Sequence, residues 1–397
     1  MTQPRSASSV NFCARTVFAA LVTSVVLIVA LAPPVLAAAP HRGTTQAELK
    51  AMLDKIVAAG APGVIGLVRD GGTTVRAASG VASLGSGRPI RPGDRYRIGS
   101  LTKTFVSTVV LQLVGEGTLR LSDPVERWLP RLVPNGRNIT IRQLLNHTSG
   151  LFNYTEDPRI MARYFPHGDR DFVWTPRELV AVATSHPPVF TPGTSWAYSN
   201  TNYILAGLIV RAATGTPIQV QLAQRIFAPL HLRHTSYPVT EAWLPDPHSH
   251  GYAYLDGPAT VPTDTTRLSA SWAGAAGAIV STVDDVARFY AALLGGHLLA
   301  PAQLASMKTM VDAVPPPARY GLGLFALPAG CATAWGHSGD FTGYNTIAIA
   351  TEHASRQVVL MMNLDNSGDP GTWTPPGVDD AFTGALLAGF CPGSGTP

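Results

Sequence analysis

The feature that most constrains the fold of this chain is a pair of β-hairpin patterns, one near each end of the sequence. Near the N-terminus, apolar segments 63–68 and 73–77 flank an Asp-Gly-Gly turn at 70–72, and segments 344–350 and 357–362 form a similar pair near the C-terminus. Short apolar runs separated by turn residues are typical of hairpins. We therefore expect the two ends of the chain to supply one antiparallel sheet.

Helical patterns accompany both hairpins and fill the middle of the chain. A capping box at 45–48 opens an amphipathic helix before the first hairpin, and apolar spacing at 382–387 predicts a helix after the second. The expected fold class is α/β. Residues 40–125 and 280–397 would form an antiparallel sheet flanked by helices, with residues 126–279 inserted as a mostly helical domain.

The composition is that of a folded chain without a nucleic-acid partner. Apolar residues make up 46% of 397 positions, which is enough for large buried cores. A formal net charge of +4 over this length makes no basic stripe, so binding to nucleic acid is not expected. His248 and His250 lack a third ligand in the sequence, so neither a metal nor another cofactor is expected.

The first 37 residues have the organisation of a secretory signal peptide. Arg5 and Arg15 precede an apolar run at 17–31, and small residues follow at 37–39. The run is short for a bilayer, which favours a cleaved leader at 1–37 over an uncleaved anchor, and no later stretch approaches membrane-spanning length. We expect an exported protein that is not held in a membrane after cleavage.

Cleavage of this leader would remove Cys13 and leave two cysteines, Cys331 and Cys391. An even pair in an exported chain favours one disulfide, with two free buried thiols as the alternative.

A Ser-x-x-Lys pattern carries the first chemical signal. Ser100 and Lys103 lie three residues apart where an apolar helix begins, so they share one face at its positive N-terminal end. A serine hydroxyl is a weak nucleophile until a neighbouring base takes its proton. Burial lowers a lysine pKa toward the range that this role needs.

Two further motifs follow along the chain. Residues 198–200 (Tyr-Ser-Asn) supply a phenol that can relay protons and an amide that both donates and accepts hydrogen bonds. Residues 336–340 (Gly-His-Ser-Gly-Asp) are typical of a glycine-bearing strand along which a substrate backbone can lie.

In this order the three motifs resemble those of the serine β-lactamase and penicillin-binding-protein superfamily, namely S-x-x-K, then Y-x-N, then H-x-G. The tyrosine and histidine variants look like the class C β-lactamase and D-alanyl-D-alanine carboxypeptidase branch (peptidase S12 family). Segments 139–151, 198–203 and 276–282 are similar to landmarks of that branch, and the resemblance extends from about 45 to 391. It implies a β-lactamase/transpeptidase-like fold.

The resemblance implies a role for each motif residue. Ser100 would be acylated, with Lys103 and Tyr198 as its proton-transfer partners. The backbone N–H groups of Ser100 and Asp340 would form the oxyanion hole. Cys331 and Cys391 occupy positions at which the resemblance implies a disulfide-linked pair. The residues expected to line the substrate cleft are Asn200, Trp272, His337, Ser338, Gly339 and Asp340.

Some of these expectations are more detailed. Asn200 would hold an amide of the substrate, and Trp272 would border the cleft unless it is a core residue. His337 would face Tyr198 with its positive or hydrogen-bonding side, and because histidine titrates near neutral pH, its charge should change the rate between about pH 5 and 8. His147 and Ser149 belong to a landmark segment and are expected to be structural.

Two departures from the branch affect the expected substrate. Its carboxypeptidases follow His-x-Gly with Thr or Ser, whose hydroxyl helps bind a free carboxylate, but here Asp340 stands there. They also place an arginine just after a Tyr-Gly-Leu-Gly-Leu strand, but here Phe325-Ala326 follows 320–324. A carboxylate repels a carboxylate. Either another arginine substitutes, or the substrate ends in an amide, an ester or an amine-bearing group.

The resemblance predicts an exported serine hydrolase that forms an acyl-enzyme. The leading expectation is a D-alanyl-D-alanine carboxypeptidase/transpeptidase that acts on peptidoglycan stem peptides and binds penicillin. A class C-like β-lactamase, a secreted esterase or D-aminopeptidase, and a catalytically silent binding protein for peptidoglycan or penicillin are the alternatives. The expected partner is a peptide or β-lactam small molecule, and a monomer is expected.

Overall fold

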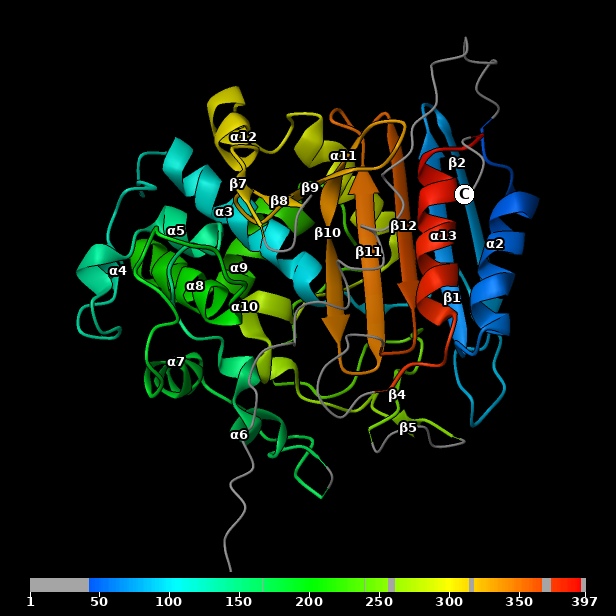
Figure 1. The fold of residues 1–397 in the computed structure, drawn as a ribbon, viewed down its shortest axis with the longest axis horizontal. Helices are drawn as coiled ribbons and strands as arrows, with labels where there is room; N and C mark the ends of the chain where they lie inside the picture. The colour runs from blue at the N-terminus through cyan, green and yellow to red at the C-terminus, as the bar shows by residue number, and fades with distance from the viewer. Residues whose placement is uncertain are drawn as a thin grey trace, which may run out of the picture.

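A computed structural model describes residues 43–393 apart from 166, 239, 256–260, 314–317 and 366–372. The expected signal peptide at 1–37 lies outside the described residues. Within them, one large sheet with helices on both of its faces dominates the molecule (Figure 1).

The described residues contain an eight-stranded sheet in which all neighbouring strands are antiparallel. Its strands are β1 (Gly63–Asp70), β2 (Thr73–Gly80), β7 (Val311–Asp312), β8 (Arg319–Tyr320), β9 (Phe325–Pro328), β10 (Thr333–Phe341), β11 (Tyr344–Ala350) and β12 (Arg356–Met362). Their order across the sheet is β2-β1-β12-β11-β10-β9-β8-β7. Two short pairs lie apart from it: β3 (Tyr96–Arg97) with β6 (Val280–Ser281), and β4 (Tyr252–Ala253) with β5 (Thr263–Asp264).

The pairing of β1 with β12, the second and third strands of the sheet, joins segments from the two ends of the chain. Val64 lies opposite Met362, and Leu67 lies opposite Val359. An ion pair between Arg356 and Asp70, with Nη2 and Oδ2 2.6 Å apart, marks the end of the ladder. Both predicted hairpins and their union in one antiparallel sheet are therefore confirmed.

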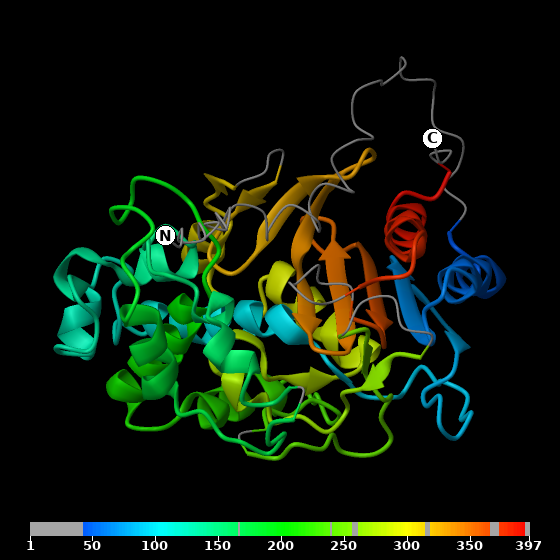
Figure 2. The same ribbon diagram turned by 60° about the horizontal axis from the view of Figure 1, so that its bottom comes forward.

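Helices cover both faces of the central strands because side chains along a strand alternate between faces. Val64 of β1 and Val358 of β12 pack in a core under α2 (Gln46–Ala58) and α13 (Val378–Phe390), which lie side by side (Figure 2). Leu67 and Val359 point the other way, into the core that contains α11 (Val283–Leu294). The predicted capping box that opens α2 is present, with Thr45 and Glu48 bonded reciprocally.

The second core continues from the sheet into the helical region without a break. It runs from Leu67 through Phe105 of α3 (Thr102–Gly115) to Leu205 of α8 (Asn200–Thr214). The segment expected as an inserted domain thus shares a core with the inner face of the sheet. The remaining helices are α4 (Val125–Trp128), α5 (Ile141–Leu145), α6 (Pro158–Met161), α7 (Pro176–Thr184), α9 (Ile218–Leu222), α10 (Gly274–Gly277) and α12 (Pro301–Met307).

No single helix in the described ranges combines the length and apolarity needed to cross a membrane. Only α8 taken together with Ile218–Phe227 meets the length and composition criteria, and this pair is bent by 80°.

A disulfide ties the last helix to the start of the β10 strand. Cys331 lies just before β10 and Cys391 just after α13, and their Cα atoms are 5.7 Å apart in the bonded pair. This is the pairing expected from the sequence, and the alternative of two free thiols is not what the structure contains.

Candidate active site

Ser100 is the middle residue of a short 3-10 turn, Gly99–Leu101, that leads directly into helix α3. Lys103 follows one helical turn later and is fully buried. Its Nζ is 2.8 Å from Ser100 Oγ, as the shared-face spacing predicted. The first N–H groups of a helix have no intrahelical partner, so this end of α3 favours developing negative charge.

The Lys103 amine has three oxygen neighbours. Besides Ser100 Oγ, its Nζ lies 2.7 Å from Asn200 Oδ1 and 2.8 Å from the carbonyl oxygen of Ala276. Both of these are acceptors, so two of its N–H groups point to them. In the neutral amine, the remaining lone pair then faces Ser100 Oγ and can accept the hydroxyl proton.

Burial lowers the pKa of Lys103 well below its ordinary value of 10.5, while the Asp340 carboxylate opposes part of the shift. A lysine amine with a depressed pKa is a suitable base for a serine hydroxyl. The geometry and the electrostatics therefore both fit Lys103 for proton abstraction.

Tyr198 approaches the same oxygen from the loop before α8. Its hydroxyl donates to Ser100 Oγ over 2.7 Å, and Lys103 Nζ is 4.7 Å from the centre of its ring. Burial raises the pKa of Tyr198 well above 10, so the phenol keeps its proton at neutral pH. This arrangement suits Tyr198 as a proton donor and Lys103 as the base.

Asn200, the first residue of α8, contacts Lys103 and a neighbouring loop. Its Oδ1 accepts from Lys103 Nζ, its Nδ2 donates to Thr155 Oγ1 over 3.1 Å, and its backbone N–H donates to Asn153 Oδ1 over 3.0 Å. In this structure the amide that was expected to hold the substrate orients Lys103. Thr155, Asn153 and the Ala276 carbonyl were not identified from the sequence, because nothing in their local patterns links them to Lys103.

Two glycines bring the serine turn against strand β10. A Cβ added to Gly99, which has φ +50°, would lie 2.4 Å from the Asp340 carbonyl oxygen, and one added to Gly339 would lie 2.0 Å from the Ile98 carbonyl oxygen. Thr346 Oγ1 adds a hydrogen bond to each segment, at 3.0 Å to Ile98 O and 3.1 Å to Gly339 O. This close approach places the backbone of Asp340 beside Ser100, where an oxyanion hole needs it.

Ser338 and Asp340 are two residues apart on β10, so their side chains point to the same side of the strand. Both side chains are partly exposed, and Asn345 Nδ2 donates to Asp340 Oδ1. At the position of the expected arginine, Phe325 and Ala326 are buried. The substrate-facing edge of β10 therefore carries a hydroxyl and a carboxylate.

His337 forms hydrogen bonds through both of its ring nitrogens. Its Nε2 lies 2.7 Å from the hydroxyl of Tyr320, its Nδ1 lies against the carbonyl oxygen of Ser338, and its ring centre is 6.5 Å from that of Tyr198. With Nδ1–H donating to the carbonyl, Nε2 accepts from the Tyr320 hydroxyl. Burial, with the charge of Lys103 adding to it, lowers the pKa of His337 to about 3. A lowered pKa favours a neutral ring at neutral pH, and the expected change of rate between pH 5 and 8 stays a prediction.

Trp272 ends a 3-10 turn, Ala270–Trp272, and packs against Phe341, the residue after Asp340, with ring centres 5.1 Å apart. The indole is partly exposed, and its backbone carbonyl accepts from the Tyr154 hydroxyl over 2.5 Å. Trp272 thus lies next to the substrate-facing strand. In the described part of the chain, no group of three or more His, Cys, Asp or Glu side chains could hold a metal ion.

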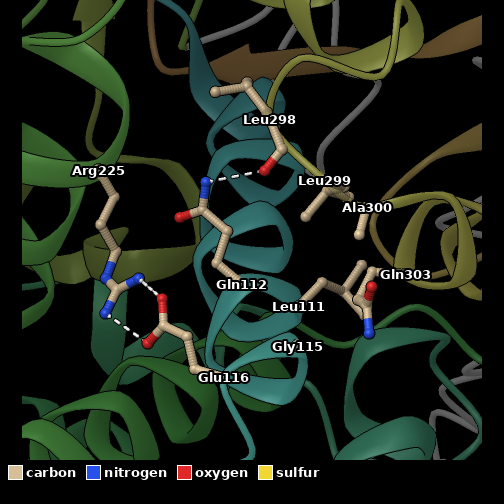
Figure 3. Close-up of a pocket in the computed structure, with 9 residues that line it drawn as sticks. All are labelled: Leu111, Gln112, Gly115, Glu116, Arg225, Leu298, Leu299, Ala300 and Gln303. Atoms are coloured by element: carbon tan, nitrogen blue, oxygen red, sulfur yellow. Dashed lines mark hydrogen bonds and ion pairs between the residues drawn. The ribbon is translucent and has the colours of Figure 1, made fainter.

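One hollow, of about 440 Å³, lies away from these residues at the C-terminal end of α3 (Figure 3). Gln112 donates there to the Leu298 carbonyl over 3.0 Å, and Arg225 pairs with Glu116. None of the residues expected at the active site lines it.

The sheet, its two layers of helices and the Ser-Lys-Tyr constellation define a serine hydrolase of the β-lactamase and penicillin-binding-protein type. The sequence profile of the Beta-lactamase family matches residues 49–378, and the chain belongs to that family.

Two solved structures are similar over most of the chain. A D-stereospecific amidohydrolase from Streptomyces sp. is 39% identical, with a TM-score of 0.79, and the match covers 89% of this chain and 100% of that one. The D-amino acid amidase of Ochrobactrum anthropi SV3 is 30% identical, with a TM-score of 0.77, over 86% and 97% of the two chains.

Similarity also extends to curated proteins. Esterase EstB of Burkholderia gladioli is 34% identical over 206 residues, which are 49% of this chain and 50% of that protein. The chain spans between 38% and 65% of the length of three curated relatives, including this esterase.

Proposed function

We propose that this protein is a serine amidohydrolase that cleaves amides or short peptides of D-amino acids through an acyl-enzyme on Ser100. The observation that carries the choice of substrate is Asp340, which places a carboxylate on the edge of β10 where a carboxypeptidase has a hydroxyl. The two similar structures named above, a D-stereospecific amidohydrolase and a D-amino acid amidase, support the same choice.

The proposed acylation uses the contacts around Ser100 directly. Lys103 accepts the hydroxyl proton as Ser100 Oγ forms a bond to the substrate carbonyl carbon, and the N–H groups of Ser100 and Asp340 stabilise the oxyanion. Tyr198 gives a proton to the leaving nitrogen as the C–N bond breaks, and the proton on Lys103 restores the tyrosine. Water then attacks the ester by the reverse route and releases the acid.

The charges beside Ser100 support a leaving group without a carboxylate. Asp340 is negative, His337 is neutral, and the pKa of Lys103 is depressed by burial. A substrate that ends in a free carboxylate would bring a second negative charge to the edge of β10. An amide or an ester brings none.

The second candidate is the D-alanyl-D-alanine carboxypeptidase/transpeptidase expected from the sequence. The three motifs in their order favour it, since the H-x-G strand and the Tyr-x-Asn loop are those of that branch. A class C-like β-lactamase and an esterase or D-aminopeptidase would use the same serine and differ only in the substrates that they turn over.

A substrate panel distinguishes these candidates. We would measure kcat/KM for D-phenylalanine amide, L-phenylalanine amide, an N-acylated D-Ala-D-Ala peptide, a chromogenic cephalosporin and p-nitrophenyl acetate. The proposal expects the D-amide to be cleaved at least about tenfold faster than the L-amide and faster than the peptide. Faster cleavage of the D-Ala-D-Ala peptide or the cephalosporin, or no cleavage of the D-amide, would replace it with the corresponding alternative.

Two variants assign the activity to Ser100. Ser100→Ala should abolish turnover of every substrate while leaving the far-UV circular dichroism spectrum unchanged. Ser86→Ala, which alters an exposed serine in the loop after β2, serves as the control and should keep full activity. Activity that survives in Ser100→Ala would refute the site.

We also propose that the protein is exported, because residues 1–37 have the organisation of a signal peptide. The N-terminal sequence of protein recovered from outside the cells tests this. It should begin near residue 38, and full-length protein confined to the cytoplasm would contradict the proposal.

A further inference from the structure

His147 is a buried residue that the sequence assigned to a structural landmark. It follows α5 and has a positive φ of 63°, and none of its side chain is exposed. A residue other than glycine in this conformation is uncommon and needs support from its surroundings. Its contacts lie on the loop that carries Tyr198.

His147 holds that loop on both sides of Tyr198. Its carbonyl oxygen accepts from the N–H of Ala197 over 3.1 Å, and its ring Nδ1 accepts from the N–H of Ser199 over 3.1 Å. The imidazole lies against the tyrosine ring itself, with centres 4.3 Å apart and planes tilted by 32°. One residue thus fixes the backbone before Tyr198, the backbone after it, and one face of its ring.

A short chain of hydrogen bonds fixes the tautomer of this imidazole. Leu151 N–H donates to Ser149 Oγ over 3.2 Å, and the Ser149 hydroxyl donates to Asn202 Oδ1 over 2.6 Å. Asn202 therefore turns its Nδ2 toward His147 Nδ1, at 3.2 Å. Because Nδ1 faces two donors, it carries the lone pair, and the proton of the neutral ring is on Nε2.

The electrostatic surroundings agree with a neutral ring. Burial lowers the pKa of His147 well below 6.5, and Lys103 and His337 lower it further whenever they are protonated. A proton on Nδ1 would set three N–H groups against one another and release the Ser199 backbone.

We propose that His147 is a positioning residue that, as a neutral imidazole, holds the Tyr198 hydroxyl over Ser100. It forms no hydrogen bond with Ser100, so it acts only through Tyr198. The inference rests on the proton-transfer role of Tyr198 in the proposed function. It does not depend on which amide or ester is the natural substrate.

Two substitutions distinguish the contribution of the imidazole ring from that of its acceptor atom, Nδ1. His147→Phe keeps a flat ring against Tyr198 but leaves the Ser199 N–H without its acceptor, whereas His147→Asn keeps an acceptor near the Nδ1 position and loses the ring. Misplacing a catalytic group by about 1 Å can cost on the order of 100-fold. We expect His147→Phe to lower kcat for p-nitrophenyl acetate by about 10- to 100-fold with KM changed less than about threefold, and His147→Asn to stay within about fivefold of the wild type.

Asn202→Asp provides a nearly isosteric second test that does not enlarge any buried side chain. The new carboxylate places an acceptor opposite Nδ1, which draws the imidazole proton to that atom and removes the acceptor of Ser199. It should lower kcat in the same direction as His147→Phe, with an unchanged circular dichroism spectrum.

A Tyr198→Phe background distinguishes positioning from a general structural role. Once the hydroxyl is absent, His147→Phe and Asn202→Asp should change kcat by less than about threefold further. Effects that multiply in the double variants would overturn the proposal, as would wild-type kcat in Asn202→Asp or in Tyr198→Phe.

The proposed function fails separately, when D-amino acid amides are not cleaved. In that case the His147, Asn202 and Tyr198 variants can still be compared by their hydrolysis of p-nitrophenyl acetate. The only requirement is that Ser100→Ala abolishes this hydrolysis.

Discussion

Asp340→Asn removes one negative charge beside the reactive serine while keeping the size of the side chain and an oxygen that can accept from Asn345. In the wild type the carboxylate should disfavour substrates that end in a free carboxylate. The variant should therefore gain activity on such substrates relative to their amides. Asp340→Thr should do so at least as strongly, because it restores the hydroxyl that carboxypeptidases of this branch carry.

The size of the effect follows from the geometry of β10. Residues two apart on one side of a strand are about 6.5 Å apart, which sets the scale for a ligand carboxylate held by Ser338 next to Asp340. Two like charges at that distance repel by about 2.5 kcal/mol at an effective dielectric constant of about 20, close to 70-fold in rate. Because Asp340 is partly exposed, solvent screening reduces this, and we expect a change of about 10- to 70-fold.

The assay compares N-acetyl-D-Ala-D-Ala with its C-terminal amide and reports the ratio of the two kcat/KM values. The wild type should favour the amide, and the ratio should shift toward the free acid in Asp340→Asn. Asp312→Asn is the matched control, because the Asp312 side chain is 93% exposed on β7 and should leave the ratio unchanged.

Added salt should move the wild-type ratio in the same direction as the Asp340→Asn substitution. A shift below about threefold in both Asp340 variants, or a wild type that prefers the free acid, would refute the assignment of substrate charge to Asp340.

Three further predictions concern packing, the disulfide and pH. Gly99→Ala should remove acylation activity because a Cβ cannot fit 2.4 Å from the Asp340 carbonyl oxygen, whereas Gly117→Ala, at another positive φ but in open space, should stay active in the same ester assay. Cys331→Ser opens a 60-residue loop and should lower the free energy of unfolding in urea by about 4 kcal/mol; a loss below about 1 kcal/mol would contradict the loop-entropy estimate. Because the pKa of His337 is about 3 when folded and about 6.5 when unfolded, the unfolded chain binds a proton that the folded chain does not. The free energy of unfolding should therefore fall as pH drops from about 6.5 toward 3, by up to about 1.4 kcal/mol per pH unit from this residue. His337→Gln should make this fall less steep. An unchanged slope in the variant would show that the ring is not held neutral.

The sheet could be predicted from the sequence because local patterns determine it. Alternation along 63–68 and 357–362 places residues such as Val64 and Leu67 on opposite faces, and the turn at 70–72 fixes the first hairpin. The pairing of β12 with β1 does not follow from the two hairpins, because either strand of one hairpin could join either strand of the other. The short strands β7 and β8 have no comparable pattern, since two residues are too few to show a period.

In the active site too, contacts within one helical turn could be predicted from the sequence, and contacts between distant segments could not. Ser100 and Lys103 are one helical turn apart, so their contact follows from their spacing. The hydrogen bond between His337 and Tyr320 does not follow from the sequence, because Tyr320 reaches His337 from another strand. Burial, which neither residue's local sequence reveals, then keeps the imidazole uncharged.

The pairing of β1 with β12 determines when the enzyme becomes active during its own synthesis. Val64 pairs with Ser79 of β2 on one side but finds its partner on the other side only in Met362, so that edge of β1 stays open until β12 has been made. Contacts over such a separation form slowly. Ser100, Lys103 and Tyr198 are synthesised well before β10, whose backbone supplies the other half of the proposed oxyanion hole. A chain cut short before β10 would carry these three residues without the strand proposed to complete the oxyanion hole, so we expect such a chain to be inactive.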